Sequence, residues 1–339
     1  MKTDVLKKAK LNYVSTDEAG YHRKRWGRGF TYLDENGDTI KDKSLREWIE
    51  SLRIPPAWED VWICSDPQGH ILATGRDSEN RKQYIYHPDW QQQTNEAKFD
   101  QLAEFGKCLP VIRQQTEANL RKRSLTREKV LAVIVCLLEK TLIRIGGEFY
   151  TQHNDSYGLT TLQDKHVAIS GKRITFEFTG KSGQDHEIDL TDKRLASVVR
   201  ICRDIPGYRL FQYYDEAGDR RTIESGDVND YLRNITGQDF TSKHFRTWGA
   251  SAYMIEALSK LPPPETEREA EKAIVQAIKE VARKLGNTPA VCRKYYVHPA
   301  VVESYQKQTL NTVFEDENTT DAPETLTIWE AALLRLISR

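Results

Sequence analysis

Four side chains in the second half of the sequence are suited to phosphate chemistry. Arg144 and Arg246 both lie near the ends of predicted helices, and Asn287 precedes Tyr296 by nine residues. Arginine forks and an amide can hold the non-bridging oxygens of a phosphodiester, and tyrosine can attack phosphorus as a nucleophile. Each residue alone is a weak signal, because a buried arginine usually serves a structural salt bridge.

The segment GKS at 180–182 is similar to the end of a phosphate-binding loop. The first glycine of that motif would fall at Thr175, inside a predicted strand. A phosphate-cradling loop must lead into a helix, whereas this segment leads into another strand. We therefore interpret 180–182 as a hairpin turn whose Lys181 can reach into a groove beside the sheet.

Taken together and in this order, the five residues resemble the catalytic set of the type IB DNA topoisomerases of the small poxvirus and bacterial branch. The set is Arg144, Lys181, Arg246, Asn287 and Tyr296. The resemblance covers residues 20–310 and includes IPPAW at 54–58, VWIC at 61–64, GHILATG at 69–75 and RKQYIYH at 81–87. Poxvirus members have histidine at the fourth catalytic position. Asn287 can donate a hydrogen bond there but cannot titrate.

The resemblance implies relaxation of supercoiled double-stranded DNA through a 3′-phosphotyrosyl intermediate on Tyr296. One phosphodiester is exchanged for another, so religation needs no ATP. Two arginines and an amide hold the developing charge, and we expect neither a metal nor any other cofactor. The 5′-oxygen leaves as a strongly basic alkoxide unless it is protonated, and Lys181 on a hairpin is suited to be the general acid.

Two adjacent tyrosines compete for the role of nucleophile. Side chains of neighbouring residues on a helix point about 100° apart, so only one of Tyr295 and Tyr296 can face the phosphate. The spacing from Asn287 in the family favours Tyr296. We expect Tyr295 to contribute packing.

One strand near the N-terminus combines basic, amide and aromatic groups. By itself this pattern fits an ordinary amphipathic edge strand equally well. With the resemblance, the strand is similar to the segment that contacts bases and backbone in the major groove. The expected DNA-binding residues are Arg81, Lys82, Gln83, Tyr84 and Tyr86. The basic run from Arg121 to Arg123 is either a solvated charge cluster or a phosphate contact.

Two other functions compete with a topoisomerase. Tyrosine recombinases use the same arginine, lysine and tyrosine set, but commonly carry histidine three residues before the second arginine, where Lys243 stands here. A non-catalytic DNA-binding relative is the second alternative, and the intact catalytic set argues against it.

These residues must be positioned by two different kinds of structure. Residues 1–92 have short apolar runs and turn dipeptides, which predict a small, mainly antiparallel β domain. The resemblance implies that this domain binds DNA. Its predicted strands start at Gly29 and cover 61–64, 70–74 and 82–86, and a capping box from Ser44 to Glu47 predicts a short helix.

Residues 93–312 are predicted to form a larger, mainly α catalytic domain with a small β-sheet. Helical periodicity runs through Phe99–Leu109 and 126–142, and helices are expected again over 192–307. Between them, 159–162, 166–169, 174–178 and 187–190 have β-type patterns. We expect residues 313–339 to form an acidic linker with a C-terminal helix over 326–337. The fold class is α+β, similar to tyrosine recombinases and type IB topoisomerases.

Composition limits the class of protein. The 339 residues carry 50 basic and 50 acidic side chains, but residues 313–339 alone hold six acidic and two basic ones. The acidic tail thus hides a mildly basic middle. The longest apolar run, 130–138, is far shorter than the ~20 residues that span a bilayer. We therefore expect no membrane partner. The resemblance implies a cytoplasmic, nucleoid-associated location and a monomer that clamps around the DNA duplex.

Overall fold

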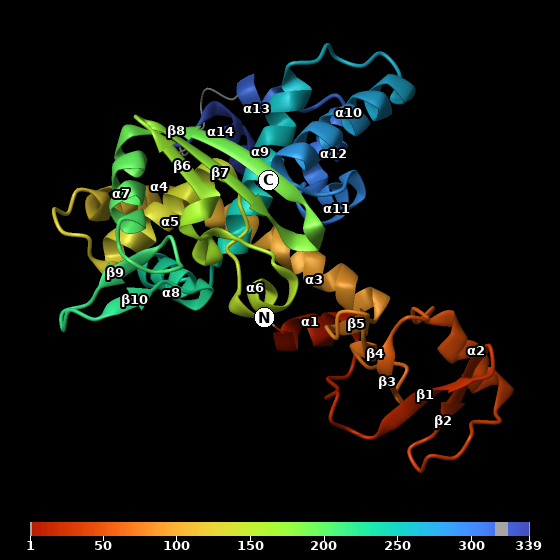
Figure 1. Cartoon of the computed structure of the whole chain (residues 1–339). Helices are drawn as coiled ribbons and strands as arrows, with labels where there is room; N and C mark the ends of the chain where they lie inside the picture. Colours follow the sequence, from red (N-terminus) through yellow and green to blue (C-terminus); the bar gives the residue numbers. More distant parts are fainter. Residues whose placement is uncertain (1, 316–324, 339) are drawn as a thin grey trace. The chain divides into compact units, whose positions relative to one another are not determined.

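The computed structural model describes residues 2–315 and 325–338 and divides into two compact units, Met1–Asp100 and Gln101–Arg339 (Figure 1). The first unit continues to residue 100 because α3 (Pro88–Asp100) packs against α1 (Lys2–Ala9). Residues 316–324 of the expected acidic linker lie outside the described residues. Within 2–315 and 325–338, no helix is long and apolar enough to cross a membrane.

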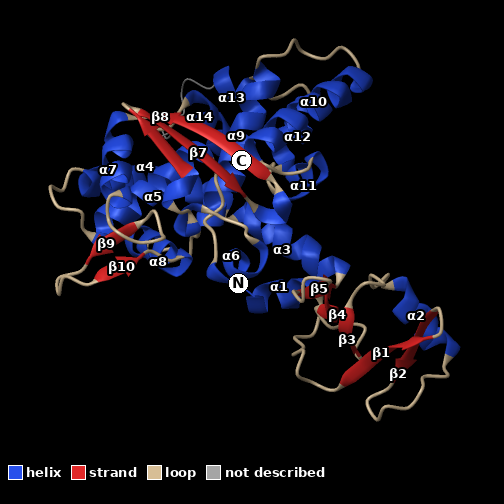
Figure 2. Cartoon of the chain, in the orientation of Figure 1, coloured by secondary structure: helices blue, strands red, loops and turns tan. Residues whose placement is uncertain are grey.

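The first unit is built on a five-stranded antiparallel sheet in the order β2-β1-β3-β4-β5 (Figure 2). Its strands are β1 (Gly20–Trp26), β2 (Gly29–Leu33), β3 (Glu59–Cys64), β4 (Ile71–Arg76) and β5 (Lys82–Tyr86). The last four match the predicted strands. The first was not predicted, because its sequence GYHRKRW has no alternation of apolar and polar side chains. Its Arg23 instead donates hydrogen bonds to the carbonyls of Ile54, Pro55 and Trp58.

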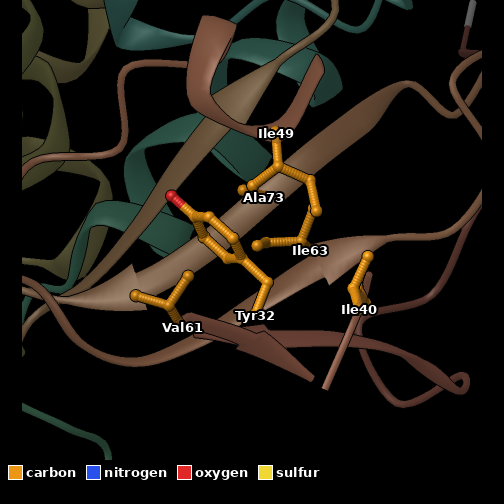
Figure 3. Packing of buried hydrophobic residues seen from close by; sticks show 6 residues of the cluster. All are labelled: Tyr32, Ile40, Ile49, Val61, Ile63 and Ala73. Atoms are coloured by element: carbon orange, nitrogen blue, oxygen red, sulfur yellow. The ribbon is translucent and has the colours of Figure 1, made fainter. Parts of the chain in front are cut away.

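One face of this sheet is covered by α2 (Lys43–Ser51), which inserts Ile49 into the core. The core side chains point toward one another in Figure 3 and are Tyr32, Ile40, Ile49, Val61, Ile63 and Ala73. The helix begins two residues earlier than its expected capping box implies. Asp42, not Ser44, is the N-cap, and its carboxylate accepts from the backbone N–H of Leu45 at 3.0 Å. Aspartate is as good an N-cap as serine, so the sequence alone did not decide which of the two neighbouring residues caps the helix.

The second unit is mainly helical and is organised around α5 (Arg127–Thr141). The apolar run 130–138 lies within α5, and Val130–Val135 are at most 1% exposed. The other helices are α4 (Leu102–Leu120), α6 (Glu148–Asn154), α7 (Lys193–Arg203), α8 (Ser225–Thr236), α9 (Ser242–Ser259), α10 (Glu267–Leu285), α11 (Pro289–Tyr295), α12 (Pro299–Gln306), α13 (Thr312–Glu315) and α14 (Ile328–Ile337). Burial on all sides explains why α5 can be apolar around its whole circumference.

Two small sheets interrupt the helices. One is antiparallel, in the order β6 (Val167–Ser170), β7 (Arg173–Thr179), β8 (Asp185–Thr191), and the other pairs β9 (Gln212–Tyr214) with β10 (Arg220–Thr222). The second pair lies inside the region predicted to be helical, so that prediction was wrong there. The α+β fold class, with a small β-rich unit and a larger helical unit, is confirmed.

The strand predicted over 159–162 is also wrong. Leu159–Thr161 and Asp164–His166 are single turns of 3₁₀ helix. The backbone N–H groups of Leu159 and Thr160 donate to the carbonyls of Arg144 and Ile145, at 2.9 and 2.7 Å. The segment therefore hydrogen-bonds to carbonyl groups about 15 residues earlier in the chain, a pairing that local patterning cannot predict.

The last helix, α14, packs into the second unit against α4 and α9. Ala332 and Leu333 are fully buried, and Glu330 accepts hydrogen bonds from Arg113 at 2.7 Å and from the Trp248 indole at 3.1 Å. Arg113 also pairs with Glu139 of α5. A buried ionic cluster thus fastens the C-terminal helix to α4, α5 and α9.

Candidate active site

The five predicted catalytic residues come from five places in the second unit. Arg144 follows α5 in an extended segment, Arg246 lies in the first turns of α9, and Asn287 follows α10. Tyr296 comes directly after the last residue of α11, and Lys181 lies in the turn that joins β7 to β8.

The backbone around Arg144 is fixed on both sides. Leu142 ends α5 in the left-handed region, at φ 55°. Gly158 lies so close to Arg144 that an added Cβ would be 2.6 Å from the Arg144 carbonyl oxygen. Only glycine fits at such an approach. The side chain of Arg144 donates to Oδ1 of Asn287, which joins two segments 143 residues apart.

Arg246 connects the segment after α5 with the end of α10. Its side chain is 4% exposed and donates to the carbonyls of Leu142 and Leu285, the latter at 2.9 Å. Burial and the neighbouring Arg144 lower the pKa of Arg246 to about 10, which leaves it protonated at neutral pH. Its guanidinium carbon lies 5.1 Å from the centre of the Tyr296 ring.

Asn287 is oriented by the end of α10. Gly286 ends that helix in the left-handed conformation at φ 59°, and the N–H of Asn287 donates to Ala282 at 3.0 Å. Thr288 then caps α11 by accepting from the N–H of Val291. A Schellman-like end and a new cap therefore fix Asn287 between two helices.

Tyr296 is held by α9 through its backbone. The Ser251 hydroxyl accepts from the N–H of His298 at 2.9 Å, and its single hydrogen is shared between the carbonyls of Thr247, at 2.9 Å, and Tyr296, at 3.2 Å. His298 caps α12. Ser251 is fully buried, and no sequence motif singled it out.

The environment of Tyr296 favours its ionised form. Burial alone would raise the pKa of its hydroxyl, but the positive charges of Arg246 and Arg144 outweigh burial and lower it. The ring of Tyr295 is instead approached by Lys294, at 5.2 Å. The two tyrosines thus have different surroundings. They do not lie on one helix as expected, because α11 ends at Tyr295.

Lys181 is exposed and lies at the rim of a small hollow that is also lined by Arg144 and Arg246. Its turn contains Ser182 at φ 65°, a left-handed conformation that serine rarely adopts. The same hollow is lined by His186 of β8, which the sequence analysis did not single out. Alternation in β8 was the available signal, since His186, Ile188 and Leu190 share its inner face.

The predicted DNA-binding strand is β5, at the edge of the first unit's sheet. The rings of Tyr84 and Tyr86 stack at 5.6 Å, and the Lys82 ammonium lies 5.8 Å from the Tyr84 ring. The side chains of Arg81 and Gln83 both donate hydrogen bonds to the carboxylate of Asp77, at 2.7 and 2.8 Å. Partial desolvation would raise the pKa of Asp77, but these hydrogen bonds lower it to about 2.

Residues 87–321 match the family model of the eukaryotic DNA topoisomerase I catalytic core. Residues 29–77 match the N-terminal domain of bacterial DNA topoisomerase IB. The DNA topoisomerase 1B of Acanthamoeba polyphaga mimivirus is 34% identical over 90% of this chain and 92% of its own. The chain belongs to the type IB DNA topoisomerase family.

More distant relatives cover the chain to different extents. The DNA topoisomerase 1B of Vaccinia virus (strain Copenhagen) is 24% identical over 82% of this chain and 87% of its own. The DNA topoisomerase 1 of Schizosaccharomyces pombe aligns with 50% of this topoisomerase and only 20% of its own chain. The resemblance predicted from the five residues is thereby confirmed for the family.

Proposed function

We propose that this topoisomerase relaxes supercoiled DNA by breaking and rejoining one strand, with Tyr296 as the nucleophile. The observation that carries the proposal is a pair of unused donors. Among the described residues, Nε of Arg246 and Nδ2 of Asn287 are buried without a hydrogen-bond partner. Buried donors are normally satisfied, so a ligand rich in acceptor oxygens fits between them. A phosphodiester is such a ligand.

The reaction follows from the same side chains. The Tyr296 oxygen passes its proton to solvent water and bonds to phosphorus, while the bond from phosphorus to the 5′-oxygen breaks. Arg144, Arg246 and Asn287 hold the non-bridging oxygens as their charge grows. Lys181 gives a proton to the departing 5′-oxygen. In religation the 5′-hydroxyl attacks the 3′-phosphotyrosine, returns its proton to Lys181 and releases Tyr296.

We extend the proposal to the way the duplex is bound. Lys82, Tyr84 and Tyr86 of β5 offer a cation and two stacked rings for contacts to DNA, while Arg81 and Gln83 shape the neighbouring turn through Asp77. One chain would close around one duplex, in the nucleoid of the cytoplasm. Sedimentation on a short duplex tests this: one chain per duplex is expected, and two chains per duplex would exclude the monomer.

Relaxation of a supercoiled plasmid in EDTA and without ATP tests the central claim. We expect full relaxation by the natural protein and a covalent protein–DNA adduct after denaturation. A protein that binds the plasmid but yields neither product would be a non-catalytic relative of the family.

A further inference from the structure

The ring of His186 fills the space between two parts of the active site. In the register of the hairpin, His186 of β8 faces Phe178 of β7, and their rings stack at 4.9 Å and 18°. This stacking fixes the ring plane against the sheet. His186 also lines the hollow that is lined by Lys181 and Arg144.

Two glycines make room for the ring. A Cβ added to Gly180 would lie 2.7 Å from Cδ2 and Nε2 of His186, and one added to Gly286 would also overlap the ring. Gly180 directly precedes Lys181, and Gly286 directly precedes Asn287. The ring is therefore wedged between the residue before the predicted general acid and the residue before the phosphate-binding amide.

The charges around the ring keep it neutral. Burial, followed by the positive charges of Arg144 and Arg246, lowers the pKa of His186, and only Asp185 acts in the opposite direction. Lys181 and Lys284 line the same hollow, so cations face the ring from the hairpin, from α9, from α10 and from the segment after α5. A protonated side chain would repel all of them, whereas a neutral imidazole does not.

We propose that His186 is a positioning residue for DNA cleavage: its ring sets the distance between the Lys181 turn and the Asn287 turn. The inference rests on the proposed role of Lys181 as the general acid. A ring held between the two glycines keeps the hairpin from collapsing onto the end of α10. Lys181 then stands where it can reach the departing 5′-oxygen.

The leaving group separates this role from a general loss of structure. His186→Ala removes the wedge, and we expect single-turnover cleavage to slow by about tenfold to a hundredfold, as a displacement of ~1 Å costs. The dissociation constant for DNA should stay unchanged. A substrate whose bridging 5′-oxygen is sulfur departs without protonation and should restore most of the rate. His186→Phe keeps the ring and should cleave the ordinary substrate almost normally.

A second experiment uses the contact with Gly180. Its backbone is outside the left-handed region, so Gly180→Ala is strained only by the His186 ring. We expect Gly180→Ala to slow cleavage and the double variant with His186→Ala to be faster than Gly180→Ala alone. Gly226→Ala, in α8 with no atom within 4 Å of its added Cβ, is the matched control and should cleave normally.

The outcomes distinguish the two proposals. If sulfur fails to rescue Lys181→Ala, the general-acid role of Lys181 is wrong. If sulfur rescues Lys181→Ala but not His186→Ala, or if the double variant is the slowest of all, His186 does not act through the hairpin. Normal cleavage by a folded His186→Ala protein would overturn the positioning role as well.

Discussion

Tyr296 and Tyr295 lie in different surroundings, and a pair of matched substitutions tests which of their hydroxyls attacks the DNA. Tyr296→Phe keeps the ring that lies 5.1 Å from the Arg246 guanidinium and removes only the attacking oxygen. We expect it to abolish the covalent adduct while DNA affinity changes little. Tyr295→Phe should retain most of the relaxation activity. Gel analysis of adduct formation on a labelled duplex measures both, and exchanged results would reverse the assignment.

Lys181 can be tested by the same chemistry that it is proposed to perform. Lys181→Ala should slow cleavage by about 10²–10⁴-fold, as loss of a general acid does. A bridging sulfur should restore most of that loss, because a thiolate hardly needs a proton. Arg144→Ala and Arg246→Ala should recover less, since charge develops on the non-bridging oxygens with either leaving group. A Lys181→Ala deficit that sulfur leaves intact would make Lys181 a purely electrostatic contact.

His186 also makes the stability of the DNA-free protein depend on pH. Its folded pKa lies below the unfolded value of about 6.5, so the unfolded chain takes up the proton first. The stability held above that pH is therefore lost as the pH falls through about 6.5 toward the folded pKa. His186→Phe cannot titrate at this position. We therefore expect its melting temperature to fall less than that of the natural protein between pH 8 and pH 5.5. Equal losses in calorimetry would show that His186 titrates normally.

At the scale of elements, the sequence predicted those whose partners are local. The periodicity of α5, and the short apolar runs and turn dipeptides of the segment that forms β2 to β5, were sufficient to place them. The 3₁₀ turn at Leu159–Thr161 was not predictable, because its N–H groups serve the carbonyls of Arg144 and Ile145. In the site, residue types suggested the phosphate-binding groups, whereas Ser251 and His186 became visible only once α9 and β8 were folded.

The attachment of α14 gives a prediction for one element. Arg113 neutralises Glu139 and Glu330 at once, all three side chains being at most 23% exposed. Arg113→Ala leaves two buried carboxylates facing each other, which should cost about 3 kcal/mol of unfolding free energy. The conservative Arg113→Lys should cost less. Chemical denaturation measures both, and an unchanged midpoint for Arg113→Ala would mean that apolar burial alone holds α14.

At the scale of the whole molecule, DNA binding should be opposed by the acidic segment before α14. Removing residues 313–339 would also remove α14 and its buried leucines, so neutralisation of the segment is the sharper test. The substitutions are Asp316→Asn, Glu317→Gln, Asp321→Asn and Glu324→Gln. We expect tighter binding at low salt and a difference that vanishes as salt rises, because binding weakens with a log–log slope of ~−0.9 per phosphate contact.

Fluorescence anisotropy across a salt series measures this effect. The natural protein supplies the reference slope, and the Arg113→Lys protein reports any indirect contribution from α14. Identical affinity and slope for the neutralised and natural chains would reduce the segment to a spacer between α13 and α14.

The hydrogen bond between Ser251 and the Tyr296 backbone would carry a mechanical load in the proposed intermediate, in which a DNA strand is bonded to the tyrosine. Tension in that strand then enters the protein at a single side chain. The Ser251 contacts to the Tyr296 carbonyl and the His298 N–H pass the pull into α9, the helix that also carries Arg246. The Tyr296 backbone and the Arg246 guanidinium are thus both attached to α9. In the proposed intermediate, load on the broken strand would therefore be carried by the same helix that positions the Arg246 guanidinium.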